Sequence, residues 1–229
     1  MENLIITIDG PAASGKSTVA RRLAQALGAS FLDTGAMYRA VTLAAMQAGV
    51  DIRDEKSLLH VIKTTSFQFD ARDNAMMVHI NGVDVTEQIR EPQITANARF
   101  AAGAPRVREK LVQMQREFAV KEARVITEGR DQGTVAFPDA DVKFYLTADA
   151  TERAKRRQAE LLAAGRKESL EQIQRAIEDR DKMDRNRTVG PLRPANDAVV
   201  IDTTGLTVEE VVTKALGYVR ERCSKKSSR

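Results

Sequence analysis

The sequence predicts an α/β fold, a three-layer sandwich with a five-stranded parallel sheet, to which an inserted β-rich lobe is added. Three observations predict it. Short apolar segments that end in polar residues alternate with segments of helical period, as expected for parallel strands joined by helices. A glycine-rich loop separates the first strand from the first helix. Between residues 64 and 86 the pattern changes to that of β-hairpins.

The N-terminal segment predicts a strand, a loop and a helix in that order. Residues 4–8 form a short apolar run that ends at Asp9 and is followed by a glycine and a proline. Residues 16–27 carry apolar side chains at helical spacing, and Gly28 is a natural helix stop.

Four further short apolar runs complete the predicted sheet. Asp33 and Thr34 are suited to cap a helix over residues 36–47. Helical segments separate the later strands, so the connections should be right-handed and ligands should bind at the carboxyl ends of the strands. The expected strands are residues 30–32, 124–129, 141–146 and 198–202.

The β-rich segment is interpreted as an insert. Two β-type runs within residues 64–86 are separated by a polar turn and followed by the turn pair Asn81-Gly82. Residues 94–120 return to a helical pattern.

Composition and charge limit the class of protein. The 229 residues, 42% hydrophobic and 30% charged, are expected to form one domain over residues 1–229. The net charge is +4, but its basic residues are mixed with acids and few aromatic residues accompany them, so we expect no nucleic-acid partner. The lone Cys223 and the lack of 18 consecutive apolar residues favour a cytoplasmic protein without a membrane partner. Part of the positive charge lies in a tail that we expect to be solvated: Lys225, Lys226 and Arg229.

Residues 10–17, GPAASGKS, match the phosphate-binding pattern G-x-x-x-x-G-K-[ST]. The glycines let backbone N–H groups point inward, where they and the positive end of the following helix cradle a polyphosphate. Lys16 adds a charge near the β- and γ-phosphates, and the Ser17 hydroxyl is placed to ligate Mg²⁺. The loop lies between a strand and a helix, as this mechanism requires.

A phosphate loop alone leaves GTPases, ATPases, small-molecule kinases and nucleic-acid motors open. Residues 202–205, DTTG, and residues 181–184, DKMD, resemble two GTPase motifs. Their order is the reverse of that in GTPases, and the second lies in a highly charged segment instead of after a strand. We therefore interpret residues 202–205 as the end of the last strand and its turn.

Arginines supply the charge that transfer between two anions requires. Such a reaction needs several fixed cations and the exclusion of water. The alternative for residues 180–187, RDKMDRNR, is a solvated helix face with i,i+4 ion pairs. The candidates are Arg39, Arg130, Arg153, Arg156, Arg157 and the arginines of residues 180–187.

Five motifs together resemble the bacterial cytidylate kinases of the nucleoside monophosphate kinase family: GPAASGKST, LDTGAMYRA, EGRDQGTVAFPDA, the E-R-A-x-R-R of residues 152–157, and RDKMDRNRTVGPL. They occur in family order. The resemblance implies a P-loop kinase fold and a monomeric enzyme of pyrimidine metabolism that uses ATP and Mg²⁺ to phosphorylate CMP or dCMP. It also implies that the insert, about residues 64–100, binds the monophosphate, and that about residues 153–190 form the lid and its flanking helices.

The resemblance also implies site residues. Arg180 and Asp184 should contact the base and ribose, and Arg130 and Arg187 should hold the acceptor phosphate. Glu128 departs from relatives that carry Asp there. ATP is expected at Gly10, Pro11, Ala12, Ala13, Ser14, Gly15, Lys16, Ser17 and Thr18, with Ser17 as the metal ligand. The acceptor is expected at Thr34, Tyr38, Arg39, Arg130, Asp131, Arg180, Asp184 and Arg187. The catalytic residues should be Lys16, Arg130 and Arg187, with Arg153 and Arg157 closing on the ATP phosphates from the lid.

An acceptor phosphate is already ionised at pH 7, so the reaction needs no general base, and His60 and His79 are expected to be structural or surface residues. Two rival functions remain. One is a P-loop kinase for UMP, dTMP or shikimate; the other is a regulator or nucleic-acid-dependent ATPase. The insert and residues 180–187 favour CMP.

Overall fold

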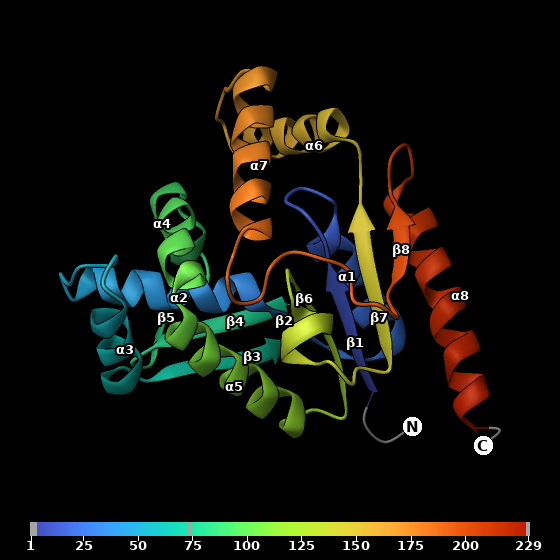
Figure 1. Cartoon of the computed structure of the whole chain (residues 1–229), viewed down its shortest axis with the longest axis horizontal. Coiled ribbons are helices and arrows are strands. Elements are labelled where there is room, and N and C mark those ends of the chain that lie inside the picture. The colour runs from blue at the N-terminus through green and yellow to red at the C-terminus, as the bar shows by residue number, and fades with distance from the viewer. Residues whose placement is uncertain (1–3, 73–74, 228–229) are drawn as a thin grey trace.

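A five-stranded parallel sheet forms the centre of the computed structural model, which describes residues 4–72 and 75–227 (Figure 1). The strand order is β2–β6–β1–β7–β8, and every neighbouring pair is parallel. This confirms the predicted fold class. The strands are β1 (Leu4–Asp9), β2 (Ser30–Asp33), β6 (Arg124–Gly129), β7 (Val142–Thr147) and β8 (Val199–Asp202).

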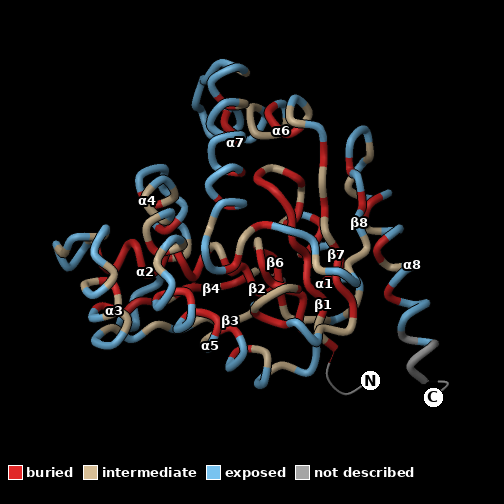
Figure 2. The backbone as a smooth tube through the Cα atoms, in the orientation of Figure 1, coloured by how far each residue is buried: buried red, intermediate tan, exposed pale blue. Residues whose placement is uncertain are grey.

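Helices cover both faces of the sheet. On one face α1 (Lys16–Leu27) and α8 (Val208–Ser227) pack with the strands into an apolar core that contains the fully buried Ile8 and Leu23. On the other face α5 (Pro105–Lys121) and the π-helical turn η2 (Gln132–Ala136) pack against β1. Figure 2 shows that the central strands are buried along most of their length.

The helix after β2 begins two residues earlier than predicted. α2 spans Thr34–Gln47, and the Asp33 side chain caps it by accepting a hydrogen bond from the Ala36 N–H at 2.8 Å. This confirms Asp33 as a helix cap. Thr34, the other expected cap, is the first residue of the helix, and its hydroxyl instead donates to the Glu128 carbonyl oxygen at 2.8 Å.

The inserted segment forms a three-stranded antiparallel sheet in the order β3–β4–β5. Asn81 and Gly82 have φ values of 51° and 79°, the left-handed conformation that a tight hairpin turn requires. The turn at residues 73–74 lies outside the described residues. The elements here are β3 (Phe67–Arg72), β4 (Ala75–Ile80), β5 (Val83–Asp84), the 3₁₀ turn η1 (Gln88–Arg90) and α4 (Pro92–Gly103).

Two helical features differ from the prediction. The helical pattern of residues 94–120 is divided between α4 and α5, because Pro105 disfavours a helical conformation at Ala104, whose ψ is 112°. A helix that we did not predict, α3 (Glu55–Thr64), precedes the hairpin. Its N-cap is Asp54, which accepts hydrogen bonds from two N–H groups of the first turn.

The charged region after β7 forms a helix pair that stands above the carboxyl edge of the sheet (Figure 1). α6 (Ala150–Ala163) and α7 (Leu170–Arg185) are capped by Asp149 and Ser169. Part of α7 has the solvated face of the alternative interpretation, with an exposed Glu171–Arg175 pair. The last two turns of α7, however, bury the carboxylates of Asp181 and Asp184. Whether this pair acts as a lid stays a prediction.

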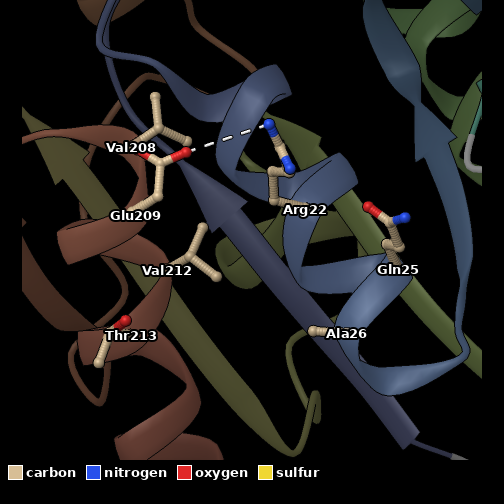
Figure 3. A pocket seen from close by; sticks show the side chains of 7 residues that line it. All are labelled: Arg22, Gln25, Ala26, Val208, Glu209, Val212 and Thr213. Carbon is tan, nitrogen blue, oxygen red and sulfur yellow. Dashed lines mark ion pairs between the residues drawn. The ribbon is translucent and has the colours of Figure 1, made fainter.

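A shallow pocket lies between α1 and α8 (Figure 3). No residue of the phosphate loop and none of the candidate arginines lines it, so we assign it no part in the phosphate chemistry. Its lining residues are Arg22, Gln25, Ala26, Val208, Glu209, Val212 and Thr213.

Several expectations for single residues can be compared with the structure. Asp202 accepts a hydrogen bond from the Thr204 N–H at 2.9 Å in a turn after β8, so residues 202–205 have the structural role that we expected. His60 is exposed on α3, and His79 is half-buried on β4. The side chains of Cys223, Lys225 and Lys226, and the whole of Arg229, lie outside what the structure describes. In the part of the chain that is described, no helix is long and apolar enough to cross a membrane.

Candidate active site

The phosphate loop turns sharply between β1 and α1. Gly10 has a φ of 148°, and a Cβ there would collide with the carbonyl oxygen of Leu146 on β7. Gly15 has a φ of 87° and is the N-cap of α1. Both positions therefore require glycine, as the motif predicts.

Lys16 folds back over the phosphate loop. Its Nζ donates to the Pro11 carbonyl oxygen at 2.6 Å and contacts the Ser14 hydroxyl oxygen at 3.4 Å. Only 4% of the residue is exposed. Burial, with the nearby Arg130 charge as the next cause, lowers the pKa of Lys16 to about 7. A phosphate group at this position would supply the negative charge that the ammonium lacks.

The strand register brings the two sides of the site together. Asp9 at the end of β1 lies opposite Gly129, and Asp33 at the end of β2 lies opposite Glu128. The Asp9 carboxylate accepts hydrogen bonds from the N–H groups of Gln132 and Gly133 at 2.9 and 2.8 Å. Burial raises the pKa of Asp9 to about 7. One carboxylate next to the phosphate loop thus fixes the turn that follows Arg130 and Asp131.

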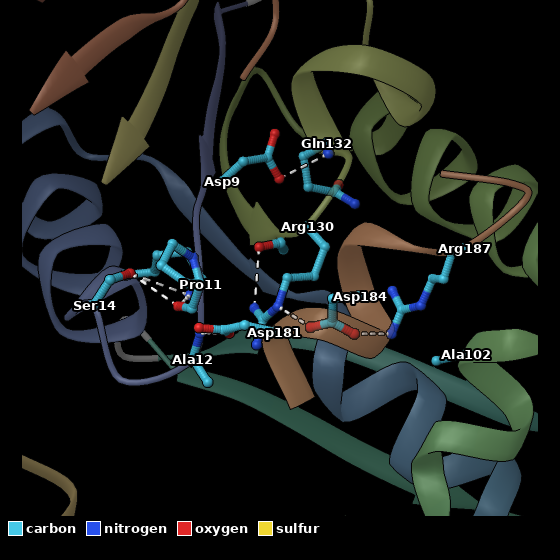
Figure 4. A network of polar contacts seen from close by, with 12 residues as sticks. Asp9, Pro11, Ala12, Ser14, Ala102, Arg130, Gln132, Asp181, Asp184 and Arg187 are labelled. Carbon is cyan, nitrogen blue, oxygen red and sulfur yellow. Dashed lines mark hydrogen bonds and ion pairs between the residues drawn. The ribbon is translucent and has the colours of Figure 1, made fainter. Parts of the chain in front are cut away.

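Asp184, on the last turn of α7, lies between two arginines (Figure 4). Its Oδ2 accepts from Arg130 Nε at 2.7 Å, and its Oδ1 accepts from Arg187. Burial opposes ionisation, but these two guanidinium groups hold the pKa of Asp184 below its usual value. Asp184 thereby fixes two arginines beside the phosphate loop.

Arg180 belongs to the same cluster but differs from its neighbours in having no salt bridge to any described carboxylate. Although the side chain retains exposed surface, the protein packed around its guanidinium and the adjacent Arg130 charge lower the pKa of Arg180 to about 10. A cation surrounded by other cations favours an anionic ligand.

A second acid–base pair lies behind Tyr38. Arg108 on α5 donates to Asp131 Oδ2, and its guanidinium carbon lies 5.5 Å from the centre of the Tyr38 ring. Burial raises the pKa of Tyr38 to about 12, so its hydroxyl stays protonated at neutral pH. Gly190, with a φ of 63°, packs against this pair so closely that a Cβ would collide with both side chains.

Asp33, at the end of β2, forms ion pairs with two further arginines, Arg39 and Arg90. Arg39 Nη2 and Arg90 Nη2 lie 3.1 and 3.6 Å from its Oδ2. Arg90 belongs to η1 of the insert, so this contact joins the insert to the end of β2. The cations and their carboxylate partners thus come from the end of β2, from α2, η1 and α7, and from the residues that directly follow β6 and α7.

A family model described as cytidylate kinase matches residues 6–221. The chain belongs to the cytidylate kinase family. It is 47% identical over 220 residues to the cytidylate kinase of Desulforamulus reducens, covering 96% of this chain and 98% of that protein. It is 45% identical over 221 residues to that of Anoxybacillus flavithermus, covering 96% and 98%. Membership in this family makes the chain an ATP-dependent nucleoside monophosphate kinase.

A solved structure shares the fold. An uncharacterized protein from Eubacterium ventriosum aligns with a TM-score of 0.50 and 14% identity, covering 95% of this chain and 99% of that one. At this identity the likeness concerns the fold alone.

Phosphoryl transfer from ATP generally involves Mg²⁺, and two side chains beside the phosphate loop fit such an ion. Ser17 Oγ donates to Glu128 Oε1 at 2.8 Å, so a hydroxyl and a carboxylate oxygen already converge beside the phosphate loop. Mg²⁺ prefers oxygen ligands and usually keeps several waters and phosphate oxygens, so two protein ligands suffice. No cluster of three or more His, Cys, Asp or Glu suited to a metal occurs among the described residues.

The two arginines expected to close on ATP from the lid have different surroundings. Arg153 reaches the phosphate loop, but through backbone atoms and a buried ion pair with Asp181. Arg157 is half-buried and pairs with Glu160 on its own helix at 2.8 Å. Arg156, between them, donates to the Thr203 hydroxyl and carbonyl oxygens at 2.9 and 2.7 Å. Of the predicted catalytic arginines, Arg130 and Arg187 meet at Asp184 and Arg153 contacts the phosphate loop, whereas the described hydrogen bond of Arg157 is to Glu160 on its own helix.

Sequence reasoning missed Arg90, Arg108 and Asp181. Arg90 and Arg108 lie in no motif that we singled out. Asp181 lay within the charged run, but we interpreted only the run's arginines and Asp184. For Asp181 the available signal was periodicity, because Ile173, Ile177, Asp181 and Asp184 recur at spacings of four, four and three and share the buried face of α7.

Proposed function

We propose that the phosphate loop and the Arg130–Asp184–Arg187 cluster divide the work of transferring the γ-phosphoryl group from ATP to CMP or dCMP. One observation supports this division above the others. Arg130 directly follows Gly129, which pairs with Asp9, and Asp9 directly precedes the loop, so the donor and acceptor cations lie beyond the carboxyl ends of two adjacent strands. Two polyanions can therefore meet end to end at the carboxyl edge of the sheet.

The reaction proceeds by direct displacement. An oxygen of the acceptor monophosphate forms a bond to the γ-phosphorus while the bond from that phosphorus to the β,γ-bridging oxygen breaks, which releases ADP. The loop N–H groups and Lys16 hold the donor phosphates, and Arg130 and Arg187 hold the acceptor phosphate. Bound at Ser17 and Glu128, Mg²⁺ would offset negative charge on the ATP phosphates. Asp184 orients both arginines in advance, so little side-chain freedom is lost in the transition state.

A panel of nucleoside monophosphates tests the function. We expect CMP and dCMP to accelerate ADP release from ATP, with UMP, dTMP and shikimate much weaker and nucleic acid without effect. The measurement is a coupled assay of ADP formation at fixed ATP and Mg²⁺. Failure of every monophosphate to accelerate ADP formation would refute the assignment, and stimulation by DNA or RNA would favour a nucleic-acid-dependent ATPase.

We further propose that the enzyme works as a cytoplasmic monomer without a nucleic-acid partner. The interleaving of acids with arginines in α7 supports the last point, since a nucleic-acid surface would carry unpaired positive charge. Light scattering after size-exclusion chromatography would measure the mass directly.

The Arg108–Asp131 pair is suited to read the base. Cytosine presents an amino donor next to a ring acceptor, and a carboxylate beside a guanidinium offers the complementary acceptor and donor. Uracil presents a carbonyl oxygen where cytosine has its amino group, and that oxygen would face the carboxylate. Asp131→Asn should therefore narrow the preference for CMP over UMP, measured as the ratio of their kcat/KM values, by about 10-fold.

The KM for ATP serves as the control for Asp131→Asn, because the phosphate loop is not in contact with Asp131 through any described hydrogen bond. An unchanged CMP to UMP ratio, with a normal KM for ATP, would remove Asp131 from base recognition. A parallel rise in both KM values would point to a general disturbance of the site instead.

A further inference from the structure

We propose that Arg153 and Asp181 are positioning residues that hold the phosphate loop through the peptide of Ala12, and so make ATP binding depend on how the helix pair α6–α7 packs. The proposal rests on the proposed function. It assigns Arg153 a different task from contact with the phosphates, and it adds Asp181, which the sequence reasoning did not include.

Both polar groups of Ala12 are bound by this pair. The Ala12 N–H donates to Asp181 Oδ1 at 2.9 Å, and Arg153 Nη1 donates to the Ala12 carbonyl oxygen at 3.0 Å. Arg153 Nη1 also lies 2.5 Å from Asp181 Oδ2, which closes the arrangement. Arg153 Nε donates to the Ala148 carbonyl oxygen at 3.1 Å, just before α6 begins. One loop residue is thus connected to α7 and to the start of α6.

The pair is buried, which separates it from a surface ion pair. Arg153 is 5% exposed and Asp181 is 1% exposed. Breaking a buried charge pair by removing one partner leaves the other uncompensated, whereas a surface pair of the same geometry contributes little. The α7 pair of Glu171 and Arg175 provides that comparison, since both side chains are about three-quarters exposed.

The side chain of Ala12 gives an independent connection to the same helices. It packs in an apolar cluster whose other buried members all come from α6 and α7: Ala154, Leu161, Ile173 and Ile177. The phosphate loop therefore packs against α6 and α7 through the side chain of Ala12. A shift of α6 against α7 would move Ala12 through contacts of both kinds.

The position of Ala12 in the loop gives this connection a consequence for ATP. Ala12 follows Pro11, whose carbonyl oxygen accepts a hydrogen bond from the Lys16 ammonium. It precedes Ala13, whose φ of 58° is unfavourable for a non-glycine residue. Both neighbours need an external constraint to keep this conformation. If the Ala12 peptide turned, the Pro11 carbonyl and the loop N–H groups would lose their inward direction.

The decisive experiment replaces the pair by apolar residues of similar size, Arg153→Met with Asp181→Leu. Replacement of a buried pair as a unit is often tolerated in stability, so the thermal midpoint should stay close to that of the wild type. The affinity for ADP, measured by isothermal titration calorimetry, should fall by about 10- to 100-fold, because two hydrogen bonds that involve charged groups are lost. The KM for CMP should change less than about 3-fold, since Asp184 keeps its own contacts with Arg130 and Arg187, which include neither Arg153 nor Asp181.

Arg175→Ala on the same helix is the matched control, and its ADP affinity and thermal midpoint should equal those of the wild type. ADP affinity that is unchanged in the folded double variant would overturn the proposal. So would a single Arg153→Met variant that loses 100-fold or more in kcat with unchanged ADP affinity, since that result would place Arg153 on the transferred phosphate.

A second variant decides the matter if the double variant does not fold. Asp181→Asn keeps the size of the side chain and an acceptor for the Ala12 N–H but removes the ion pair. A fall in ADP affinity of about 3- to 10-fold would support the proposal, and an unchanged affinity would overturn it. Titration with ADP requires no turnover, so it tests this connection even if CMP proves not to be the acceptor. The monophosphate panel alone tests the proposed function.

Discussion

Lys16→Met is expected to lower kcat by about 10³-fold or more, which would make it the most damaging substitution at the donor side. The ammonium lies in a loop from which water is largely excluded, with 4% of the residue exposed. A charge in such a place interacts far more strongly with a transferring phosphoryl group than it would in water. Single-turnover transfer from ATP to CMP would measure the loss directly.

Lys16→Met should not destabilise the nucleotide-free protein. Because burial lowers the pKa of Lys16 to about 7, the charged lysine is held at a cost that methionine does not have. A lysine whose pKa is lower in the folded than in the unfolded state makes stability rise with pH, here between about pH 7 and its ordinary value of 10.5. Lys16→Met should therefore match or exceed the wild-type thermal midpoint at pH 7 and should lack this rise.

An unstable Lys16→Met variant, or one that keeps its kcat, would contradict this account. In the first case Lys16 would be a structural residue, bound to Pro11 and Ser14 for the sake of the loop. In the second case the loop N–H groups alone would hold the donor phosphates.

The loop and the sheet could be predicted because their signals are local. Each strand is a short apolar run, and the phosphate loop is a contiguous motif whose glycines are required by backbone geometry at Gly10 and Gly15. α3 was missed although it has an N-cap at Asp54, because we gave no weight to a ten-residue helix beside the insert.

The pairing within the site could not be predicted, because it joins residues far apart in the chain. Asp181 binds a loop 169 positions away, and Arg130 meets its carboxylate partner 54 positions later. A list of arginines does not reveal which are free to meet a ligand. In the structure Arg153 is committed to a carboxylate and a backbone oxygen, Arg157 to its neighbour Glu160, and Arg180 to no carboxylate within salt-bridge distance among the described residues.

Arg130→Met is the acceptor-side counterpart of Lys16→Met, and kcat/KM for CMP should fall by about 10³- to 10⁴-fold. Arg130 directly follows β6 and donates a hydrogen bond to the Asp184 carboxylate on α7. Its removal takes away a cation at the acceptor phosphate and leaves Asp184 with Arg187 as its remaining close partner. The pKa of Asp184 should then rise, since Arg130 is the largest of the charges that lower it.

The kinetic pattern distinguishes this role from the donor site. The KM for ATP should stay within about 3-fold of the wild type in Arg130→Met, because the loop hydrogen bonds do not include Arg130. Arg187→Ala should have a milder effect, mainly a higher KM for CMP, since Arg130 would still be oriented by Asp184. Comparable losses of ATP and CMP affinity in either variant would contradict the division into donor and acceptor cations. Such a result would mean that the arginine binds both phosphates equally. Asp184→Asn completes the test: if its carboxylate acts through the two arginines, combining it with Arg130→Met should cost less than the product of the two separate losses.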